Sequence, residues 1–249
     1  MTISEVEVLG FPLANLTQDE AARHLLSMMP TAHPYTVCTP NPEMIERALA
    51  EEDLRRSLSA ADLLLADGVG VLWASRFLGA GLPGTIPGVD LMEALLRAGA
   101  SRGLRVFLLG TTRDNVEAAK RRAERDYPGL GAIEAHHGYF SEADTPRVLE
   151  AMAGFRPDLV LVGMGVPRDQ LFLSRLRNQL PPAVYLAVGG GLDVMSGAVR
   201  RAPRWMRRLR LEWLYRLATS PSRWRRQLAL PRFVLRVLWV RLAGGPTLR

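Results

Sequence analysis

The stretch LLLADGVGV, residues 63–71, contains the pattern that decides the fold. Its leucines and alanine are typical of a buried β-strand, and they are followed at once by the acid Asp67 and by Gly68 and Gly70. A short apolar strand that ends in a polar turn before a helical segment is the unit of parallel α/β sheets. Ligands bind just beyond the carboxyl ends of such strands, so the position of Asp67 raises the question of a functional role.

The same alternation of strands and amphipathic helices extends from residue 6 to about residue 195. Helical connections of this length join parallel strands, so the sequence predicts an α/β fold with a Rossmann-like, mostly parallel sheet and helices on both faces. The expected strands are VEVLGFPL (6–13) and residues 35–39, 62–66, 105–110, 158–164 and 183–191. The expected helices are residues 18–29 (capped by Thr17), 42–58, 88–103, 113–126, 141–155 (capped by Ser141) and 168–179.

Charge divides the chain in two. Residues 200–249 contain fourteen arginines and a single acid, a net charge of +13, whereas residues 1–199 carry a net charge of −6. Beyond Gly197 no strand pattern occurs and apolar residues recur at helical spacing. The sequence therefore predicts a Rossmann-like body over residues 1–197 and an Arg-rich helical appendage over residues 198–249. Such an appendage would meet an anionic partner: phosphates, nucleic acid or a membrane surface.

The composition points to an intracellular enzyme-sized protein. The chain has 249 residues, 48% of them hydrophobic, which suffices for a full core. The single cysteine, Cys38, excludes an internal disulfide. Neither a signal-peptide pattern nor an apolar run of about 18 residues is present, so a cytoplasmic location without a membrane span is expected.

Polar residues and glycines follow five of the expected strands. Because the carboxyl ends of parallel strands meet at one edge of a sheet, these residues are expected to converge on one crevice. Turn formation or helix capping would explain any one of these loops alone, but five together favour a ligand site. The residues are Thr39 and Asn41, Asp67, Gly110 to Thr112, Gly163 and Gly165, and Gly189, Gly190 and Asp193.

Two interpretations of Asp67 remain open. Partial desolvation at the mouth of a crevice would raise the pKa of its carboxyl and make it a general base. It could equally be the N-cap of a helix that starts near Val69, in which case amide hydrogen bonds would lower its basicity.

The last expected strand runs into GGGLDV (189–194), where glycines allow close approach to a ribose-phosphate and Asp193 could bind ribose hydroxyls. Neither the G-x-G-x-x-G nor the G-x-x-x-x-G-K-[ST] loop occurs, which disfavours NAD or ATP as a cofactor. His136 and His137 are adjacent, so their side chains should diverge on a strand, and no metal site is predicted there.

Two features of the appendage suggest anionic contacts. Arg216, Arg223 and Arg226 are spaced so that they could converge on a diphosphate, although a solvated or lipid-facing basic surface is the plainer alternative. Residues 228–243 have the pattern of an interfacial helix, with Arg232 and Arg236 one turn apart. Packing against a partner helix is the competing interpretation.

With these residues identified, the sequence resembles the WecG/TagA/CpsF glycosyltransferases of bacterial surface-polymer synthesis. Motifs typical of this family occur in family order across about residues 6–226. They are TPNPEM (39–44), ADGVGVLWASRFLG (66–79), PGVDLM (87–92), HHGYF (136–140), VGGGLDVMSGAVRRAP (188–203) and LEWLYRL (211–217).

The resemblance implies an inverting, metal-independent transfer of N-acetylmannosamine, or a related sugar, from a UDP-sugar. The acceptor would be the 4-hydroxyl of N-acetylglucosamine linked through diphosphate to a polyprenol. Asp67 would be the catalytic base, and the appendage would close over the site and sit at the inner face of the cell membrane. The substrate-binding residues would be Thr39, Asn41, Asp169, Gln170, Gly189, Gly190, Asp193, Arg216, Arg223 and Arg226. No cofactor is expected, and the association of protomers stays open.

Two positions depart from the family pattern. Thr85 stands where arginine is frequent, and Arg168-Asp169-Gln170 replaces the usual Lys-Gln-Glu after Pro167. Both positions would lie near substrate, so the sugar specificity could differ. The alternative class of function is an anionic-lipid or nucleic-acid binder on a non-catalytic scaffold. Nucleic acid is disfavoured because the aromatic residues of the appendage recur on an apolar helical face and are not displayed for stacking on bases.

Overall fold

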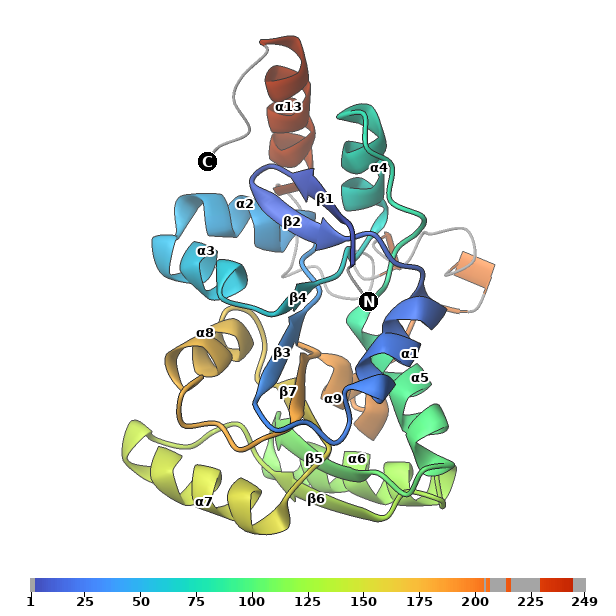
Figure 1. The fold of residues 1–249 in the computed structure, drawn as a ribbon, viewed down its shortest axis with the longest axis vertical. Coiled ribbons are helices and arrows are strands. Elements are labelled where there is room, and N and C mark those ends of the chain that lie inside the picture. Colours follow the sequence, from blue (N-terminus) through green and yellow to red (C-terminus); the bar gives the residue numbers. More distant parts are fainter. Residues whose placement is uncertain (1–2, 204, 207–213, 216–228, 244–249) are drawn as a thin grey trace.

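The computed structural model describes residues 3–203, 205–206, 214–215 and 229–243. Its centre is a six-stranded sheet in which every neighbouring pair is parallel, with the order β4-β3-β8-β7-β5-β6 (Figure 1). The predicted α/β fold is therefore confirmed. The strands are β3 (Tyr35–Cys38), β4 (Leu63–Leu64), β5 (Arg105–Gly110), β6 (Ala132–His136), β7 (Leu159–Gly163) and β8 (Val184–Ala187).

Helices cover both faces of the sheet because successive strand side chains point to opposite sides. In β5, Val106 and Leu108 pack into a core shared with α1, α5, α6 and α9, whereas Phe107 and Leu109 face the core shared with the remaining helices. No described helix has the length and apolar composition needed to cross a bilayer. The helices are α1 (Gln18–Ser27), α2 (Pro42–Ala50), α3 (Glu52–Ser59), α4 (Val69–Phe77), α5 (Gly88–Ala100), α6 (Arg113–Asp126), α7 (Thr145–Phe155, after a 3-10 turn at Glu142–Asp144), α8 (Arg168–Arg175), α9 (Gly191–Ser196) and α13 (Ala229–Leu242).

The expected first strand is in fact a hairpin that lies outside the main sheet. β1 (Glu5–Val8) pairs antiparallel with β2 (Phe11–Ala14). Leu9 and Gly10 form the two-residue turn, and both have positive φ angles, 52° and 84°. This is the conformation that favours a tight hairpin, but a leucine at the first position hides the signal in the sequence. The prediction of one strand over residues 6–13 was therefore wrong.

Three further elements differ from expectation. The helix expected over residues 42–58 is two helices, because the backbone of Glu51 is extended (φ −118°, ψ 104°) between α2 and α3. The strand expected over residues 62–66 pairs only at Leu63 and Leu64. β6 was missed, since it is an edge strand in which only Ile133 is fully buried. An edge strand needs little apolar sequence and so gives a weak pattern.

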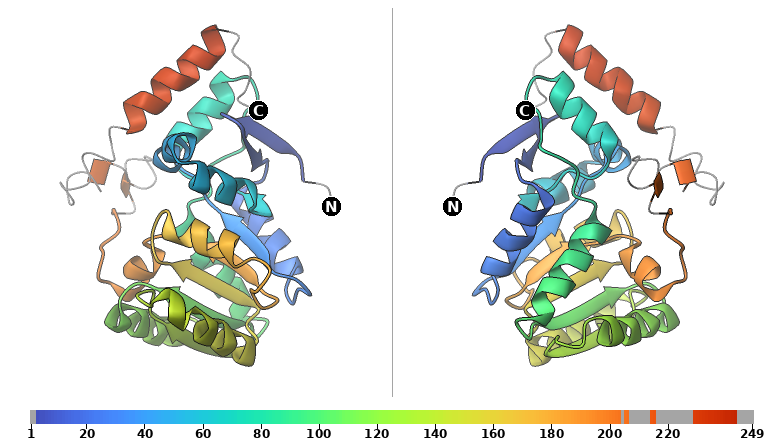
Figure 2. Two further views of the ribbon diagram at one scale, coloured as in Figure 1. Left: turned by 90° about the vertical axis from the view of Figure 1, so that its left-hand side faces the viewer. Right: turned by 90° about the vertical axis from the view of Figure 1, so that its right-hand side faces the viewer.

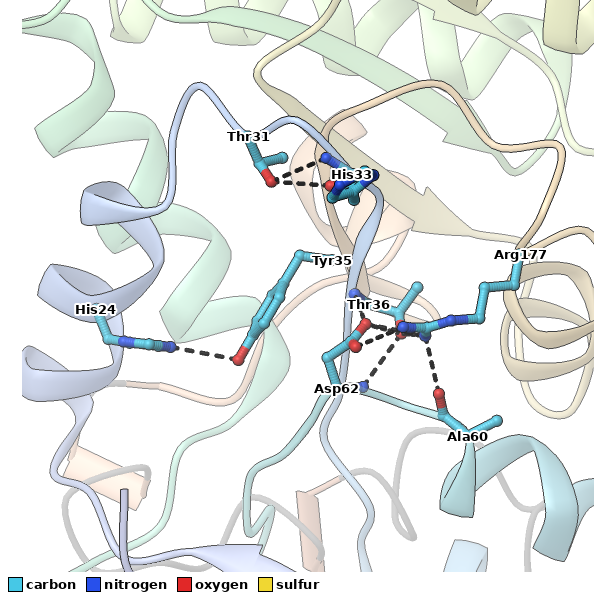
Figure 3. Close-up of polar contacts among 8 residues, drawn as sticks. All are labelled: His24, Thr31, His33, Tyr35, Thr36, Ala60, Asp62 and Arg177. Atoms are coloured by element: carbon cyan, nitrogen blue, oxygen red, sulfur yellow. Dashed lines mark hydrogen bonds and ion pairs between the residues drawn. The ribbon is translucent and has the colours of Figure 1, made fainter. Parts of the chain in front are cut away.

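A cluster of polar side chains lies at the amino-terminal ends of β3 and β4 (Figure 3). The carboxylate of Asp62 accepts hydrogen bonds from the Thr36 amide (2.7 Å) and hydroxyl (2.9 Å) and from both terminal nitrogens of Arg177 (2.9 and 2.5 Å). Arg177 also donates to the Ala60 carbonyl (2.9 Å). The hydrogen-bonding groups of the cluster pair with one another, and they join the loop after α8 to β3 and β4. The role of the cluster is therefore structural.

Candidate functional site

The loops after β3 and β4 and the segment that leads into α5 are hydrogen-bonded to one another. The Asp67 amide donates to the Pro40 carbonyl (3.0 Å), and the Ile86 amide donates to the Ala66 carbonyl (2.7 Å). Segments that are up to 46 residues apart in the sequence thus meet at the carboxyl edge of the sheet. This is the convergence that the strand-end residues predicted for this part of the edge.

Thr39 lies at the centre of this junction. A Cβ atom placed on Gly88 would be 2.9 Å from the Thr39 hydroxyl oxygen and 3.5 Å from the Ala187 carbonyl oxygen. The start of α5 therefore lies against the Thr39 side chain and near the end of β8, and a Cβ atom at position 88 would clash with the Thr39 hydroxyl. Only 6% of Thr39 is exposed, so only a small part of this residue reaches the surface.

Asn41 is the N-cap of α2, where its side-chain oxygen accepts a hydrogen bond from the Met44 amide (2.9 Å). The cap fixes the orientation of the side chain and leaves its NH₂ group as the part that can bind a ligand. The next residue, Pro42, packs on the start of α4, where a Cβ atom on Gly70 would be 2.7 Å from the proline ring. The TPNPEM and ADGVG motifs are therefore in direct contact.

Asp67 is half-buried, three residues beyond the end of β4 and just ahead of α4. The N-cap position of α4 belongs to the following residue, Gly68, whose φ angle of 87° turns the chain into the helix. The alternative interpretation of Asp67 as the N-cap was therefore wrong. Its carboxylate is held at the helix entrance by a backbone that is tied to Pro40.

A second polar group joins the loops after β5 and β8. Asp193, in the first turn of α9, accepts hydrogen bonds from the Thr111 hydroxyl and from the Asn115 side-chain nitrogen (3.0 Å). The carboxylate is partly buried and is oriented by these two donors. Gly189 and Gly190 lie directly before α9, Gly189 with a φ of 53° and Gly190 exposed. The sequence prediction did not single out Asn115, although its position three residues after the N-cap Thr112 places it in the first turn of α6.

Asp169 holds the Gly189 loop from the interior of the protein. Its side chain is completely buried, and its two oxygens accept hydrogen bonds from the amides of Met164 (2.6 Å) and Gly189 (2.9 Å). Burial raises the pKa of this carboxyl to about 7, although the amide hydrogen bonds oppose the shift. Asp169 thus connects the loops after β7 and β8 and offers no surface to a ligand in this structure.

Gln170 is equally inaccessible, with 2% of its surface exposed. Within the described part of the chain its side-chain oxygen has no hydrogen-bond partner. Asp169 and Gln170, which were expected to touch substrate directly, are therefore both buried, and of the two Asp169 is hydrogen-bonded to the Gly189 loop.

The HHGYF motif lies after β6 at the same edge. The ring centres of His136 and His137 are 4.7 Å apart, and the Nδ1 atom of His136 is hydrogen-bonded to the His137 carbonyl oxygen (2.8 Å). The expectation that these side chains diverge was therefore wrong. Tyr139 is 68% exposed, and the Arg168 guanidinium lies 5.5 Å from the centre of its ring while donating to the Gly138 carbonyl (2.7 Å). An exposed aromatic ring backed by a cation is a further binding feature that the choice of candidate residues missed.

The three arginines expected to hold a diphosphate, Arg216, Arg223 and Arg226, lie outside the described residues. Among the described parts of the appendage, helix α13 packs on α2 and α4. There Arg236 forms a two-pronged ion pair with Glu46 of α2, with distances of 2.8 and 3.2 Å. Glu46 is only 8% exposed. Arg236 is therefore part of an internal contact and does not belong to the interfacial arginine pair expected with Arg232.

Comparisons with known proteins agree with these motifs. A profile of the family described as "Glycosyl transferase WecG/TagA/CpsF family" matches residues 6–246. The chain is 38% identical over 202 residues to the N-acetylglucosaminyldiphosphoundecaprenol N-acetyl-beta-D-mannosaminyltransferase of Bacillus spizizenii, which covers 81% of this chain and 78% of the relative. It is 32% identical over 236 residues to the protein of the same name from Staphylococcus aureus, covering 94% and 92%.

Proposed function

The chain belongs to the WecG/TagA/CpsF family of glycosyltransferases, and from this we propose that it transfers N-acetylmannosamine, or a related sugar, from a UDP-sugar to a lipid-linked acceptor. The acceptor would be the 4-hydroxyl of N-acetylglucosamine carried on a polyprenyl diphosphate, as the names of the relatives suggest. Membership in this family contradicts the alternative of a non-catalytic scaffold. The observation that carries the proposal is the meeting of the loops at residues 39–42, 66–70 and 86–88 around Asp67.

In the proposed reaction Asp67 is the general base. Its carboxylate takes the proton of the acceptor 4-hydroxyl while that oxygen bonds to the anomeric carbon of the donor sugar. The bond from this carbon to UDP breaks on the opposite face, which inverts the configuration. The position of Asp67 supports this role because its backbone is tied to Pro40, which keeps the carboxylate beside the loops that would hold the sugars.

The neighbouring loops would hold the two substrates. We assign Thr39 and Asn41 to the reacting sugars, since both lie beside Asp67 and the Asn41 NH₂ group is oriented by its helix cap. Gly189 and Gly190 would allow the UDP backbone to approach closely, and Asp193 would meet the ribose hydroxyls. Asp169 would act by holding the Gly189 loop through its hydrogen bond to the Gly189 amide, and Gln170 follows it in the buried first turn of α8.

Charge on the leaving UDP would be balanced by Arg216, Arg223 and Arg226, whose guanidinium groups are permanently charged and suit a diphosphate. The sequence has no Asp-x-Asp motif of the kind that would bind a metal–diphosphate complex. These arginines are therefore the candidates for balancing the negative charge of the diphosphate. They belong to the appendage proposed for residues 198–249, as distinct from the catalytic body at residues 1–197.

We propose that the protein binds peripherally to the inner face of the cell membrane through α13. Phe233, Val237 and Val240 of this helix are buried against the body. The stripe on the other side, Leu235, Trp239 and Leu242, is 66%, 60% and 81% exposed. Because α13 also lacks acids, its outer face suits the surface of an anionic bilayer.

Product analysis tests the proposed function. The full-length protein would be incubated with a panel of UDP-sugars and a short-chain lipid-diphosphate N-acetylglucosamine acceptor, and the product linkage determined by mass spectrometry and NMR. We expect one UDP-N-acetylhexosamine to give a β-linked disaccharide lipid. Transfer of a different sugar would show that the donor specificity differs from that expected, and hydrolysis or no transfer with every donor would contradict the proposal.

A further inference from the structure

Helix α4 connects the candidate site to an apolar surface at one end of the molecule. It starts just after Asp67, and at about 1.5 Å per residue its nine residues extend about 14 Å from the sheet edge. The chain then continues through LGAGLPG (78–84), a loop without charged or hydrogen-bonding side chains. We call residues 78–84 the α4 tip.

The α4 tip is an ordered loop that turns small apolar groups outward. Leu82 is 3% exposed and anchors the loop, while its amide donates to the hydroxyl of the buried Ser75 (3.2 Å). The Ala80 amide donates to the Ser75 carbonyl (3.0 Å). Residues 79–81 and Pro83 are exposed. A surface that is apolar, exposed and held in place by its own hydrogen bonds is suited to contact with another apolar phase.

The α4 tip lies at the same end of the molecule as the C-terminal end of α13. The two helices pack against each other, and in Figures 1 and 2 both point away from β5, β6 and α7. The exposed residues Trp239 and Leu242 belong to the last two turns of α13. The α4 tip and the C-terminal part of the outer stripe of α13 therefore both present exposed apolar groups at this end of the molecule.

The positive charge beside these apolar groups indicates an anionic partner. Arg76 lies in the last turn of α4 and Arg241 in the last turn of α13, and both are exposed. No aspartate or glutamate occurs in residues 69–87 or 229–243. Apolar groups bordered by arginines, in two segments that contain no acids, match the headgroup region of an anionic bilayer, where arginine binds lipid phosphate and apolar groups enter the acyl boundary.

We propose that the α4 tip is a second bilayer contact, which acts together with the outer stripe of α13. The inference rests on the proposed membrane association of α13. Two contacts fix the tilt of a protein on a membrane, which a single helix cannot do. Because α4 is rigid and begins beside Asp67, the bilayer would then lie about one α4 length from the base. That distance is comparable to a diphosphate plus one sugar ring, the part of the acceptor that must reach from the membrane to the site.

A fluorescent label at residue 80 tests the contact. Cys38 is the only cysteine, is 1% exposed, and burial raises the pKa of its thiol to about 12, so it will not compete for a thiol reagent. Ala80→Cys, Leu235→Cys and Ala153→Cys would each be coupled to an environment-sensitive dye. Ala153 is an exposed alanine on α7 and is the matched control. Each protein would be mixed with phosphatidylglycerol–phosphatidylcholine vesicles, with and without acyl-chain quenchers.

We expect the labels at residues 80 and 235 to shift to the blue and to be quenched from the acyl chains, while the label at residue 153 stays unchanged. A response at residue 235 with residue 80 behaving like residue 153 would overturn the second contact and leave the proposed function intact. A response at residue 80 alone would overturn the joint surface. No response at either position would contradict membrane association itself, while the transferase proposal would still be judged by product analysis.

Substitution gives an independent measure. Ala80→Glu should weaken sedimentation with the same vesicles about fivefold, the effect of one unfavourable charge near an anionic surface. Ala153→Glu adds the same charge at the other end of the molecule and should change nothing. Equal binding by the two variants, with circular dichroism showing both folded, would overturn the inference.

Discussion

Asp67 is the single side chain on which turnover depends most in the proposed reaction. It lies half-buried at the entrance of α4, and its amide is tied to Pro40, so an amide side chain of the same shape fits in its place. Asp67→Asn should therefore fold and bind UDP as the wild type does. We expect its turnover to fall by about 10²–10⁴, because asparagine cannot accept the acceptor proton.

Isothermal titration with UDP and a turnover assay on the lipid-linked acceptor would measure the two effects separately. Glu150→Gln removes a carboxylate from an exposed position on α7 and serves as the control for loss of charge. Near-wild-type turnover by Asp67→Asn would reject Asp67 as the base.

Asp62 determines part of the acid stability. Burial is the largest influence on its carboxyl and raises the pKa, but the hydrogen bonds from Arg177 and Thr36 together outweigh it, and the net pKa is lowered. A lowered folded-state pKa means that the stabilisation is complete above the unfolded value, near pH 4, and is lost as the pH falls through the folded value. Asp62→Asn should therefore lower the free energy of unfolding by about 1–3 kcal/mol at pH 7 and make the loss of stability below pH 4 shallower.

Urea unfolding between pH 3 and pH 7 measures this difference. Asp53→Asn is the matched control because Asp53 also pairs with an arginine, Arg56, but on the exposed surface of α3. Its unfolding midpoint should stay unchanged, since exposed ion pairs contribute little. A midpoint shift of the same size in both variants would show that the Asp62 cluster has no special structural role.

At the scale of elements, α13 has two opposite stripes, one packed against the body and one proposed to contact the membrane. Phe233 is 1% exposed and faces the body, whereas Leu235 is 66% exposed and faces outward. Phe233→Ala should weaken the docking of α13 by about 3 kcal/mol and speed hydrogen exchange across residues 229–243. Leu235→Ala should leave exchange unchanged and instead weaken binding to anionic vesicles.

Hydrogen-exchange mass spectrometry and vesicle sedimentation together distinguish the two stripes. The sequence offered two interpretations of residues 228–243, an interfacial helix and a helix packed against a partner helix. The structure shows one face of α13 packed on other helices and leaves the opposite face exposed. Identical behaviour of the two variants in both assays would contradict this division.

At the scale of the whole molecule, the body and the appendage are interdependent. Phe233, Val237 and Val240 belong to the same core cluster as residues of α2 and α4. Removal of all residues after Gly197 should therefore abolish most transfer to the lipid-linked acceptor, since it deletes the three proposed diphosphate arginines and the membrane contact. It should also lower the unfolding temperature, because apolar surface on α2 and α4 becomes exposed.

Differential scanning calorimetry and the transfer assay would measure these changes on the truncated chain. The double change Glu46→Gln with Arg236→Gln serves as a milder comparison, since it removes the ion pair that joins α13 to α2 and keeps the appendage. Full transfer activity of the truncated chain would show that the appendage is dispensable.

The sequence by itself determined the α/β class, the order of most elements and the edge of the sheet at which the candidate residues gather. These follow from local patterns: β5 and α6 were predicted with the bounds that the structure shows, because their apolar periodicity is strong and Thr112 caps the helix. Asp67, Thr39 and Asn41 could be grouped because residues after parallel strands must share an edge. The hairpin turn at Leu9 and the edge strand β6 lacked such a local signal.

Only the tertiary structure decided how each candidate residue is used. Gly68, not Asp67, occupies the N-cap of α4, Asp169 lies buried beneath Gly189, and Arg236 pairs with Glu46 on another helix. Burial and ion pairing depend on neighbours that are distant in the chain, as with the 190 positions between Glu46 and Arg236. Local sequence records which chemical groups are present, whereas their exposure and their partners are fixed only when the whole chain packs.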